Sequence, residues 1–408
     1  MLFDDDFGSC RNITQYLPAI SEKVGHCRPK LSFCVNNPNL TSPRIIIAGG
    51  GTGGHVFPAL AIQQALSRRC TNATVIFVGT CHGLEATVIP RVGETLYKLW
   101  ISGFSRQHIL RNMLLPIKLA VSFGQSLALL SRFRPHTVIG TGGYVMGPVL
   151  WTAQHLKIPT LIQEQNSFPG YTTRRLAPKA SMVCAGFEDV KSRLPGVRVE
   201  FTGNPLRASF TAIDRGTAQK RWALDASRKT VLVFGGSAGA RSINEAIAGA
   251  LRELLESFNV IWQTGRLGIP SSLDQTVIQT AIAAKRLIVR EFIDDMASAY
   301  AAADLAVCRA GAMTLAELAM IGLPAVLIPY PFATDDHQTA NANSVVERGA
   351  AVIIPDRELN AGKIMSVIKD SMQDELKLAQ MASHMKSLAR PDAADRIAGI
   401  ALTLAGLS

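Results

Sequence analysis

Short apolar runs recur along the chain and are separated by longer segments with a helical spacing of apolar positions. Such runs are typical of strands buried on both faces, and helix-length segments between them suit parallel crossover connections. The sequence therefore predicts an α/β fold with parallel sheets. Strands are expected at residues 45–48, 74–78, 137–140, 159–162, 181–184, 199–202, 230–234, 260–262, 287–289, 305–307 and 325–328.

The same order of strand, glycine loop and helix occurs in both halves of the chain. A length of 408 residues suits two domains or more. The turn Gly203-Asn204-Pro205-Leu206-Arg207 links the halves, so we divide the chain into residues 44–206 and 207–390. Residues 1–43 have little periodicity and carry the acidic run Asp4-Asp5-Asp6, which we interpret as a solvated charge run. We expect this extension to be poorly ordered.

The first glycine loop, Gly49-Gly50-Gly51-Thr52-Gly53-Gly54-His55, follows the first strand, and a helix is expected from near Pro58 to Arg69. A glycine loop between strand and helix is the usual cradle for phosphate. The loop is not a P-loop, because it lacks the Lys of that motif. No acidic residue closes the next strand, which disfavours a dinucleotide. A lone His is often structural, but the glycines around His55 favour a general base.

Two later loops of the first half also carry polar residues at strand ends. Thr141-Gly142-Gly143-Tyr144 is a second glycine loop, and Gln163-Glu164-Gln165-Asn166 follows the strand at 159–162. Polar residues at the carboxyl ends of parallel strands belong to a site more often than to a core. Arg207, in the turn between the halves, is placed to reach the same cleft.

In the second half, Gly235-Gly236-Ser237-Ala238-Gly239-Ala240 follows a strand and precedes a helix expected from Ser242. The Ser237 hydroxyl can donate to a phosphate beside the N–H groups of that helix. The loop from Glu291 to Met296 is placed for its backbone to contact a base edge. Its paired Asp294 and Asp295 suit helix capping better than metal binding.

The segment Cys308-Arg309-Ala310-Gly311-Ala312-Met313-Thr314-Leu315-Ala316-Glu317 links a buried strand to a helix that is expected to end at Ile321, before Gly322. Gly311 allows a ligand close to the backbone, and the helix start favours negative charge. Glu317 lies one turn further on the same face. A carboxylate there suits a diol such as a ribose, which makes the arrangement nucleotide-shaped. An ordinary α/β turn with a solvated Glu remains open.

The loop at residues 329–338 precedes a helix and places Asp335, Asp336, His337 and Gln338 where they can meet sugar hydroxyls. No His, Cys or Asp cluster has the spacing of a metal site, so no metal cofactor is expected.

Composition narrows the class of partner. The chain is 48% hydrophobic and 18% charged, so it can form a large core, and its net charge of +11 favours an anionic partner. The basic residues are spread out without a recognition-helix or RNA-binding signature, so nucleic acid is disfavoured. Seven cysteines without a C-x-x-C pair indicate reduced thiols.

Residues 109–130 form the most apolar long segment, but its uncharged part is too short to span a bilayer. Basic residues lie near both ends: Arg106, His108, Arg111 and Lys118, then Arg132 and Arg134. Two interpretations of this segment remain open. It can form an interfacial patch that inserts into an anionic membrane, or a crossover helix packed on the sheet, and the two can apply to different faces of the same helix.

Taken together, the motifs give a resemblance. From Arg44 onward, the chain resembles the MurG family, the N-acetylglucosaminyltransferases that convert lipid I into lipid II in peptidoglycan synthesis. The motifs that carry the resemblance are Gly50-Gly51-Thr52-Gly53-Gly54-His55-Val56-Phe57-Pro58, Gly142-Gly143-Tyr144-Val145, Glu164-Gln165-Asn166, Gly203-Asn204-Pro205, Gly235-Gly236-Ser237 and Arg309-Ala310-Gly311-Ala312 through Glu317.

The resemblance implies a GT-B-like architecture of two Rossmann-like domains facing a central cleft. Residues 207–390 would bind UDP-GlcNAc, residues 44–206 would bind the lipid-linked acceptor at the membrane, and the helix within 391–408 would pack back on the first domain. The enzyme would be peripheral, on the cytoplasmic face of the cell membrane, near other cell-wall synthesis proteins.

The resemblance also implies roles for single residues. His55 would be the base for the acceptor 4-hydroxyl, Glu317 would hold the ribose, Ile293 the uracil and Gln338 the sugar. Gly142, Gly143 and Tyr144 would lie on the acceptor side. Pyrophosphate contacts would come from Ser237, Ala312, Met313, Thr314 and Leu315, and contacts from the opposite wall from Thr52, Gly53, Gly54, Asn166 and Arg207.

The sequence departs from the family pattern at Ala238, where the family often has Gln. Competing hypotheses are another GT-B enzyme, such as a UDP-sugar:diacylglycerol transferase or a UDP-GlcNAc epimerase, and a non-catalytic nucleotide-sugar-binding adaptor. An assay with lipid I as acceptor separates them.

Overall fold

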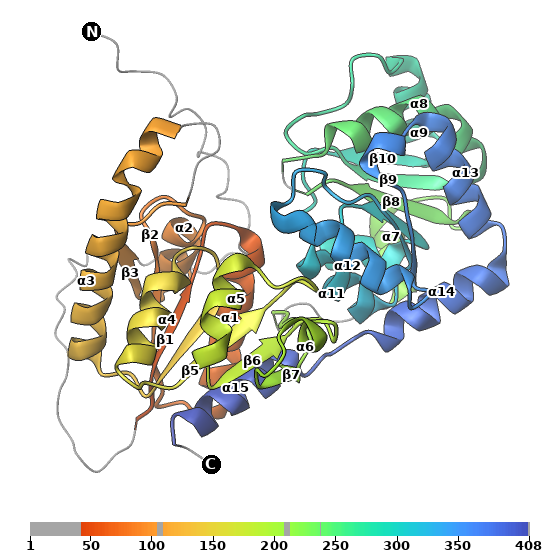
Figure 1. Ribbon diagram of the computed structural model, residues 1–408. Coiled ribbons are helices and arrows are strands. Elements are labelled where there is room, and N and C mark those ends of the chain that lie inside the picture. Colours follow the sequence, from red (N-terminus) through yellow and green to blue (C-terminus); the bar gives the residue numbers. More distant parts are fainter. Residues whose placement is uncertain (1–41, 104–108, 208–212, 237, 407–408) are drawn as a thin grey trace, which may run out of the picture.

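A computed structural model describes residues 42–103, 109–207, 213–236 and 238–406. The predictions for residues 1–41, for Arg106 and His108 and for Ser237 lie outside the described residues. Within these ranges the chain forms two α/β lobes joined at residues 203–207 and again near the C-terminus (Figure 1). The predicted fold class, two parallel-sheet Rossmann-like domains, is confirmed.

The first lobe is built on a parallel sheet with the strand order β3-β2-β1-β4-β5-β6-β7. Its central strands β1, β4 and β5 are buried, as their unbroken apolar sequences require. Its strands are β1 (Arg44–Gly49), β2 (Thr74–Thr80), β3 (Leu96–Leu99), β4 (Thr137–Gly142), β5 (Thr160–Glu164), β6 (Met182–Ala185) and β7 (Val199–Phe201).

The second lobe repeats the design with the order β10-β9-β8-β11-β12-β13, again all parallel. Strands β3 and β13 at the sheet edges have no counterpart among the predicted strands. The strands of the second lobe are β8 (Thr230–Phe234), β9 (Asn259–Gln263), β10 (Leu287–Arg290), β11 (Leu305–Cys308), β12 (Ala325–Leu327) and β13 (Ala351–Ile353).

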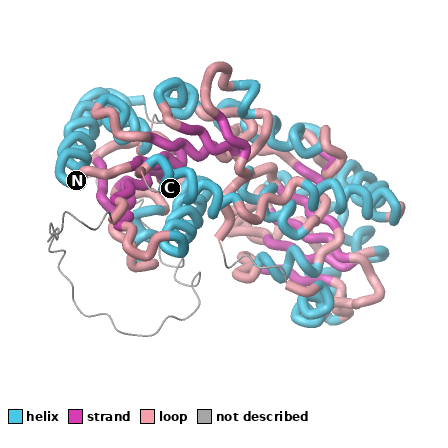
Figure 2. The backbone as a smooth tube through the Cα atoms, turned by 90° about the horizontal axis from the view of Figure 1, so that it is seen from below, coloured by secondary structure: helices cyan, strands magenta, loops and turns pink. Residues whose placement is uncertain are grey.

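Helices cover both faces of the first sheet (Figure 2). One face carries α3 (Leu115–Phe133), which follows the short 3-10 helix η2 (Ile109–Leu114), and α4 (Met146–His155), α5 (Tyr171–Leu176), η3 (Ala177–Lys179) and α6 (Val190–Arg193). The other face carries α1 (Gly53–Arg69), α2 (Glu85–Arg91) and the last helix, α15 (Ala393–Leu404).

The second sheet is covered in the same way. One face carries α8 (Arg241–Ser257), α9 (Gln275–Ala283) and α13 (Ala361–Met372). The other carries α7 (Arg215–Trp222), α10 (Met296–Ala302), α11 (Ala312–Ile321), α12 (His337–Val346) and part of α14 (Glu375–Ser387). The 3-10 helices η4 (Thr334–Asp336) and η5 (Asp356–Glu358) lie in loops.

The C-terminal segment returns to the first lobe (Figure 1). Ile397 and Ala401 on α15 share a buried cluster with α1, and the Ala401 carbonyl accepts a hydrogen bond from Thr137 Oγ1 at 3.3 Å. An ion pair of 2.8 Å joins Arg396 to Glu200. The two lobes are therefore held together by a second crossing besides the turn at 203–207.

The strand order reverses at one place in each sheet. In the first sheet β1 lies between β2 and β4, and in the second β8 lies between β9 and β11. Ligands of open α/β sheets bind outside the carboxyl ends of the strands at such switch points. The loops that open there are the glycine loops after β1, β4 and β8 and the start of α11.

Candidate active site

Helix α1 begins at Gly53, earlier than the predicted start near Pro58. The Thr52 carbonyl accepts hydrogen bonds from the N–H groups of His55 and Val56, each at 3.1 Å, so two glycines and His55 form the first turn. Pro58 lies just inside the helix, where its missing N–H costs one early hydrogen bond. His55 is thus held on a helix rather than on a free loop.

The hydrogen bond of the His55 ring fixes its tautomer. Nδ1 lies 3.0 Å from the Gly50 carbonyl oxygen. Because a carbonyl oxygen only accepts, Nδ1 must carry the proton, and the neutral ring keeps a lone pair on Nε2. Burial lowers the pKa of His55, although the Gly50 carbonyl, Glu164 and Glu85 oppose this. The ring is therefore neutral near pH 7, as a general base requires.

The two glycine loops of the first lobe pack against each other around this ring. A Cβ on Gly142 would lie 2.4 Å from His55 Cδ2, and a Cβ on Gly143 would lie 2.6 Å from the Gly50 oxygen. Tyr144, which follows, is partly exposed, and burial of its ring raises the pKa of its hydroxyl. The structure thus brings Gly142, Gly143 and Tyr144 next to His55.

Gly142→Ala is expected to lower turnover because its methyl group would displace the His55 ring. Gly51→Ala is a matched control: both glycines have positive φ, 112° and 91°, but a Cβ on Gly51 would meet nothing within 4 Å. Both variants should lose about 1–2 kcal/mol of stability from backbone strain. Thermal unfolding and a turnover assay check this. Equal turnover in the two variants would contradict the proposed contact with His55.

In the second lobe, α11 presents its start at the switch point. Gly311 is the N-cap residue, and the first helical hydrogen bond runs from the Leu315 N–H to the Gly311 carbonyl at 3.0 Å. The N–H groups of Ala312, Met313 and Thr314 precede that bond and can bind an anion. The predicted strand, turn and helix at this position agree with the structure, including the end of α11 before Gly322.

Glu317 lies one turn along α11. Its Oε2 accepts a hydrogen bond from the Tyr300 hydroxyl at 2.9 Å. Burial raises the pKa of Glu317 to about 7, while Tyr300 and the charge of Arg207 act in the opposite direction. The guanidinium of Arg207 lies 4.8 Å from the centre of the Phe57 ring on α1. Arg207 therefore lies between the first lobe and the carboxylate of the second.

Gln263, at the end of β9, was missed by the sequence reasoning. Its Nε2 donates to the Gly236 carbonyl at 3.2 Å, and its Oε1 accepts from the Ile293 N–H at 2.9 Å. This buried amide joins the glycine loop after β8 to the loop after β10. The only available signal was a polar residue closing an apolar strand. Because the Ile293 N–H is already bonded, its carbonyl is the group left for a base.

Asn166 lies at the contact between the lobes. Its Oδ1 accepts from Asn341 Nδ2 at 3.1 Å, and the same nitrogen donates to the Ala310 carbonyl at 3.2 Å. Asn341 Oδ1 accepts from the Ser167 N–H at 2.8 Å. The sequence did not indicate Asn341. Its buried side-chain amide on α12 holds residues 166–167 of the first lobe against the loop that precedes α11.

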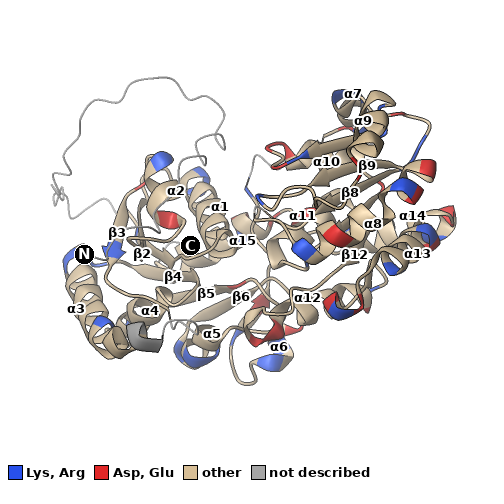
Figure 3. Ribbon diagram, turned by 90° about the horizontal axis from the view of Figure 1, so that it is seen from above, with Lys and Arg blue, Asp and Glu red and all other residues tan. Residues whose placement is uncertain are grey.

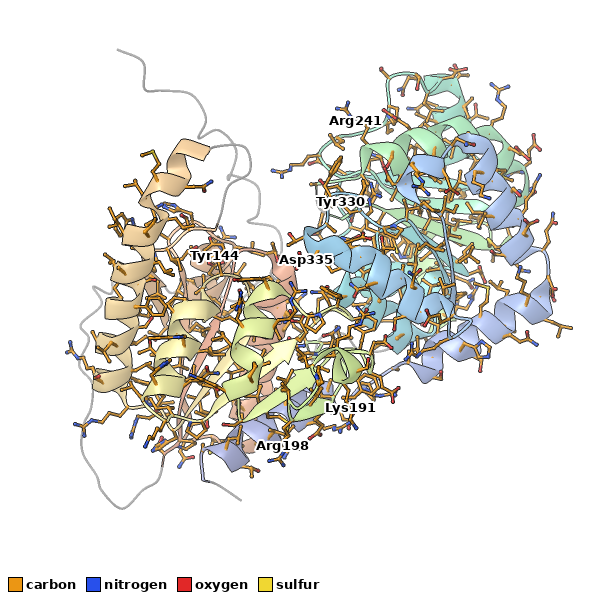
Figure 4. All side chains as sticks on the ribbon, in the orientation of Figure 1. Tyr144, Lys191, Arg198, Arg241, Tyr330 and Asp335 are labelled. Carbon is orange, nitrogen blue, oxygen red and sulfur yellow. The ribbon has the colours of Figure 1, made fainter. Side chains whose placement is uncertain are left out.

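The loop before α12 lies on the side of the second lobe that contacts the first lobe. Gln338 Oε1 accepts from the Tyr330 N–H at 3.0 Å, and Asp335 pairs with Arg174 of the first lobe at 2.9 Å. Figure 4 labels Asp335 and Tyr330, which lie on the side of the second lobe nearest the first. The charge of His337 acts on His55. The loop is therefore near the predicted base.

The predicted residues thus fall into two groups, one in each lobe. His55, Thr52, Gly53, Gly54 and the second glycine loop belong to the first lobe, and Glu317, the start of α11 and Gln338 to the second. Asp295 caps α10 by accepting from the Ser298 N–H, as predicted. Within the described ranges, no group of three or more His, Cys, Asp or Glu is arranged to hold a metal ion.

The sequence matches both domains that define one family of glycosyltransferases. Residues 45–185 match the glycosyltransferase family 28 N-terminal domain, and residues 230–397 match the glycosyltransferase family 28 C-terminal domain. The two matches correspond to the two lobes.

Sequence similarity to other proteins covers nearly the whole chain. UDP-N-acetylglucosamine--N-acetylmuramyl-(pentapeptide) pyrophosphoryl-undecaprenol N-acetylglucosamine transferases from Chlorobium limicola and Bacteroides thetaiotaomicron are 41% and 39% identical to it. The alignments cover 88% and 89% of this chain and 99% and 98% of those proteins. The crystal structure of Acinetobacter baumannii MurG is 30% identical, with a TM-score of 0.72, over 88% of this chain and 99% of that one.

Proposed function

The chain belongs to the MurG family of glycosyltransferases, and we propose on this premise that it transfers N-acetylglucosamine from UDP-GlcNAc to the MurNAc-pentapeptide of lipid I, giving lipid II. The observation that carries the proposal is the pairing of a neutral His55, with Nε2 available, and a nucleotide-shaped group of residues in the opposite lobe. The relatives that share both lobes bear the name of this transferase.

The donor would lie along the second lobe. The Glu317 carboxylate would accept from both ribose hydroxyls, and the Ile293 carbonyl would meet the uracil. The pyrophosphate would bind the free N–H groups of Ala312, Met313 and Thr314 at the start of α11, beside Leu315 and Ser237. Gln338 would donate to the sugar hydroxyls. Contacts from the first lobe would come from Thr52, Gly53, Gly54, Asn166 and Arg207.

The chemistry would be a direct displacement that inverts the anomeric carbon. His55 Nε2 takes the proton of the acceptor 4-hydroxyl as the oxygen attacks. A covalent intermediate would need a carboxylate nucleophile. The two buried carboxylates with a charge effect on His55 are engaged instead: Glu85 accepts from the Gly51 N–H, and Glu164 from the Asn166 and Gly170 N–H groups.

Negative charge develops on the departing UDP. The start of α11 and Arg207 would stabilise it, since fixed dipoles and a guanidinium need no reorganisation during the reaction. That the reaction needs no metal cofactor stays a prediction. Measuring turnover with and without a chelator tests it.

The deciding experiment incubates the full chain with lipid I and radiolabelled UDP-GlcNAc and scores lipid II. Labelled lipid II is the expected product. Product with diacylglycerol but not with lipid I, conversion of UDP-GlcNAc without an acceptor, or binding of UDP-GlcNAc without any turnover would each overturn the proposal in favour of one of the competing hypotheses.

Membrane attachment would come from α3 and the turn before it. Within the described residues, the segment Asn112–Phe133 is long and apolar enough to cross a membrane by length and composition. It instead lies along one side of the first lobe and buries Leu129, Leu130 and Phe133 (Figure 1). Its exposed apolar side chains are Met113, Leu114, Ile117, Leu119, Val121 and Leu127.

Charge supports an interfacial position for this helix. It carries Lys118 and Arg132 and no acidic residue, so Figure 3 shows blue without red along it. The Lys118 ammonium lies 5.9 Å from the ring of the exposed Trp100. A basic, partly apolar surface with an aromatic residue suits the interface of an anionic membrane. The enzyme would thus be peripheral, on the cytoplasmic face.

Ile117→Glu is expected to reduce flotation with anionic vesicles because it places a charge on the exposed side of α3, where Ile117 is 55% exposed. Turnover on lipid I in detergent should be retained. The matched control is Leu376→Glu on α14, at a side chain that is 78% exposed in the other lobe. Equal flotation of the two variants, or binding insensitive to salt, would contradict this surface.

A further inference from the structure

Glu85 is a buried carboxylate that none of the predicted site groups includes. Its side chain is 1% exposed and lies at the start of α2. Three hydrogen bonds reach it: Oε2 accepts from the Gly51 N–H at 2.8 Å, and Oε1 accepts from the Thr80 N–H at 2.9 Å and from Thr80 Oγ1 at 2.8 Å. Burying a carboxylate is costly unless such donors compensate it. These three donors compensate that cost and hold the carboxylate inside the first lobe.

The space around Glu85 is kept free by three glycines. An added Cβ would lie 2.4 Å from the carboxylate at Gly50, 2.4 Å from Cγ at Gly79 and 2.1 Å from Oε2 at Gly83. These glycines come from the loop after β1, from β2 and from the turn before α2. A side chain at any one of them would push the carboxylate out, so the cradle holds this residue in one position.

The hydrogen bonds of Glu85 and His55 meet on one peptide unit. The Gly51 N–H that Glu85 accepts and the Gly50 carbonyl that accepts from His55 Nδ1 belong to the same peptide group. A carboxylate that binds the N–H end of a peptide increases the negative charge on its oxygen. That oxygen is the acceptor that orients the His55 ring.

We propose that Glu85 is a positioning residue for the transfer reaction, acting on His55 through the Gly50–Gly51 peptide. This inference rests on the proposed function, because it assigns Glu85 a part in the work of the proposed base. The Glu85 carboxylate accepts from the Gly51 N–H, and the Gly50 oxygen of the same peptide accepts from Nδ1–H of His55. This arrangement leaves Nε2 free for the hydroxyl of the acceptor substrate. When Nε2 gains the acceptor proton, the imidazolium is stabilised by the polarised peptide oxygen.

Other groups also face His55 and set the baseline for its titration. Burial lowers its pKa, the Gly50 carbonyl, Glu164 and Glu85 raise it, and His337 of the second lobe lowers it. Glu164 differs from Glu85 in its contacts, because its oxygens accept from the Asn166 and Gly170 N–H groups. Its charge therefore reaches His55 through space, whereas that of Glu85 also reaches it through the shared peptide.

The test is Glu85→Gln in the full chain, which keeps the shape but removes the charge and one of the two acceptor oxygens. Histidine NMR with labelled ring nitrogens should show the His55 pKa lowered, because removing the Glu85 charge removes one of the groups that raise it. The proton should also leave Nδ1 in part of the molecules. Turnover on lipid I should fall about tenfold, with UDP-GlcNAc affinity unchanged. A His55 titration and tautomer identical to those of the parent would overturn the proposal, even if turnover fell.

Two further variants make the result specific. Glu94→Gln changes a different carboxylate of the first lobe, which is only partly buried and accepts from Gln63 Nε2 at 2.6 Å, and should leave the His55 titration unchanged. Glu85→Asp keeps the charge but withdraws it from the Gly51 N–H, and should shift the His55 pKa in the same direction by less. If Glu85→Gln does not fold, the Glu85→Asp titration decides.

The design separates this inference from the proposed function. Full turnover in His55→Ala would remove His55 as base, and with it the premise on which Glu85 acts. Lost turnover in His55→Ala with an unchanged His55 titration in Glu85→Gln would leave the proposed function standing and overturn the role of Glu85 alone.

Discussion

Replacing His55 with alanine should lower turnover on lipid I by about two to four orders of magnitude, the usual contribution of a positioned general base. UDP-GlcNAc affinity should change little, because the proposed donor contacts come mainly from the second lobe. The reason is geometric: the ring keeps its proton on Nδ1, bonded to the Gly50 carbonyl, and leaves Nε2 as the acceptor. Steady-state kinetics with lipid I, together with calorimetry of donor binding, separates the two effects.

His155→Ala is a matched control for this substitution. That ring is exposed on α4, and its Nδ1 lies 2.7 Å from the Trp151 carbonyl, a contact of the same kind. In detergent the control should keep turnover. Unchanged turnover in His55→Ala would remove the residue as base, and a parallel loss of donor affinity would assign it to binding instead.

The pH dependence of turnover follows from the same ring. Burial holds the His55 pKa below its ordinary value of 6.5. Since the reaction needs the neutral form, the acidic limb of the kcat/KM profile for lipid I, which reports the enzyme before lipid I binds, should lie below that pH.

Glu317→Ala should weaken UDP binding by about 1–3 kcal/mol, the cost of losing a buried carboxylate–hydroxyl interaction. This corresponds to a rise in Kd of about 5- to 150-fold. The carboxylate already accepts from Tyr300 through Oε2, so the donor would add the ribose hydroxyls to an oriented group. Calorimetry with UDP measures the change, and a Kd equal to that of the parent would contradict the assignment.

Glu253→Ala offers a control in the same lobe. That carboxylate is half exposed and pairs with Lys369 on the face covered by α8 and α13. Its removal should leave UDP binding unchanged, because surface ion pairs contribute little. If both variants bound UDP equally well, Glu317 would have no special part in the donor site.

Protonation of Glu317 gives the donor site its own pH dependence. Burial raises its pKa to about 7 in the free protein. A ribose diol donates to the ionised form, so UDP affinity should be constant above that pH and fall as the pH decreases through it. At about one pH unit below the pKa, binding should release nearly one proton. Calorimetry in buffers of different ionisation enthalpy measures this release, and Glu317→Gln should abolish it.

The effect on stability has the opposite sign. Because the folded pKa of Glu317 lies above its ordinary value of 4.5, folding favours the protonated form. Its contribution to stability is therefore full below the unfolded pKa and is lost as the pH rises toward the folded value. Bound UDP should offset this loss, since it favours the ionised carboxylate.

The predicted elements of the two sheets agree closely with the structure because their signals are local. Apolar runs marked the buried strands, and a glycine after the last helical turn marked the end of α11 at Ile321. The start of α1 was predicted too late. Pro58 suggested a first turn, but the helix begins at Gly53, where the Thr52 carbonyl is already bonded.

The predicted positions of the site residues depended on the same local signals. Glycine loops and polar residues at strand ends pointed to His55, Tyr144 and Asn166, because parallel strands of one sheet present their carboxyl ends at one edge. Helical spacing after the start of α11 pointed to Glu317. The contacts of these residues were not predictable. Asn341 lies 175 residues from Asn166, and no local pattern distinguishes it from other helical asparagines.

The sequence by itself determined the two parallel sheets, the glycine loops at their switch points and the residue types of the chemistry, since periodicity and turn propensity act over a few neighbouring residues. Only the tertiary structure decided which nitrogen of His55 carries the proton, that Gln263 joins two loops, and that Glu85, 34 residues from Gly51, binds the peptide behind the base. Those choices depend on hydrogen bonds between segments that meet only when the sheets have formed, and the sequence does not encode that meeting locally.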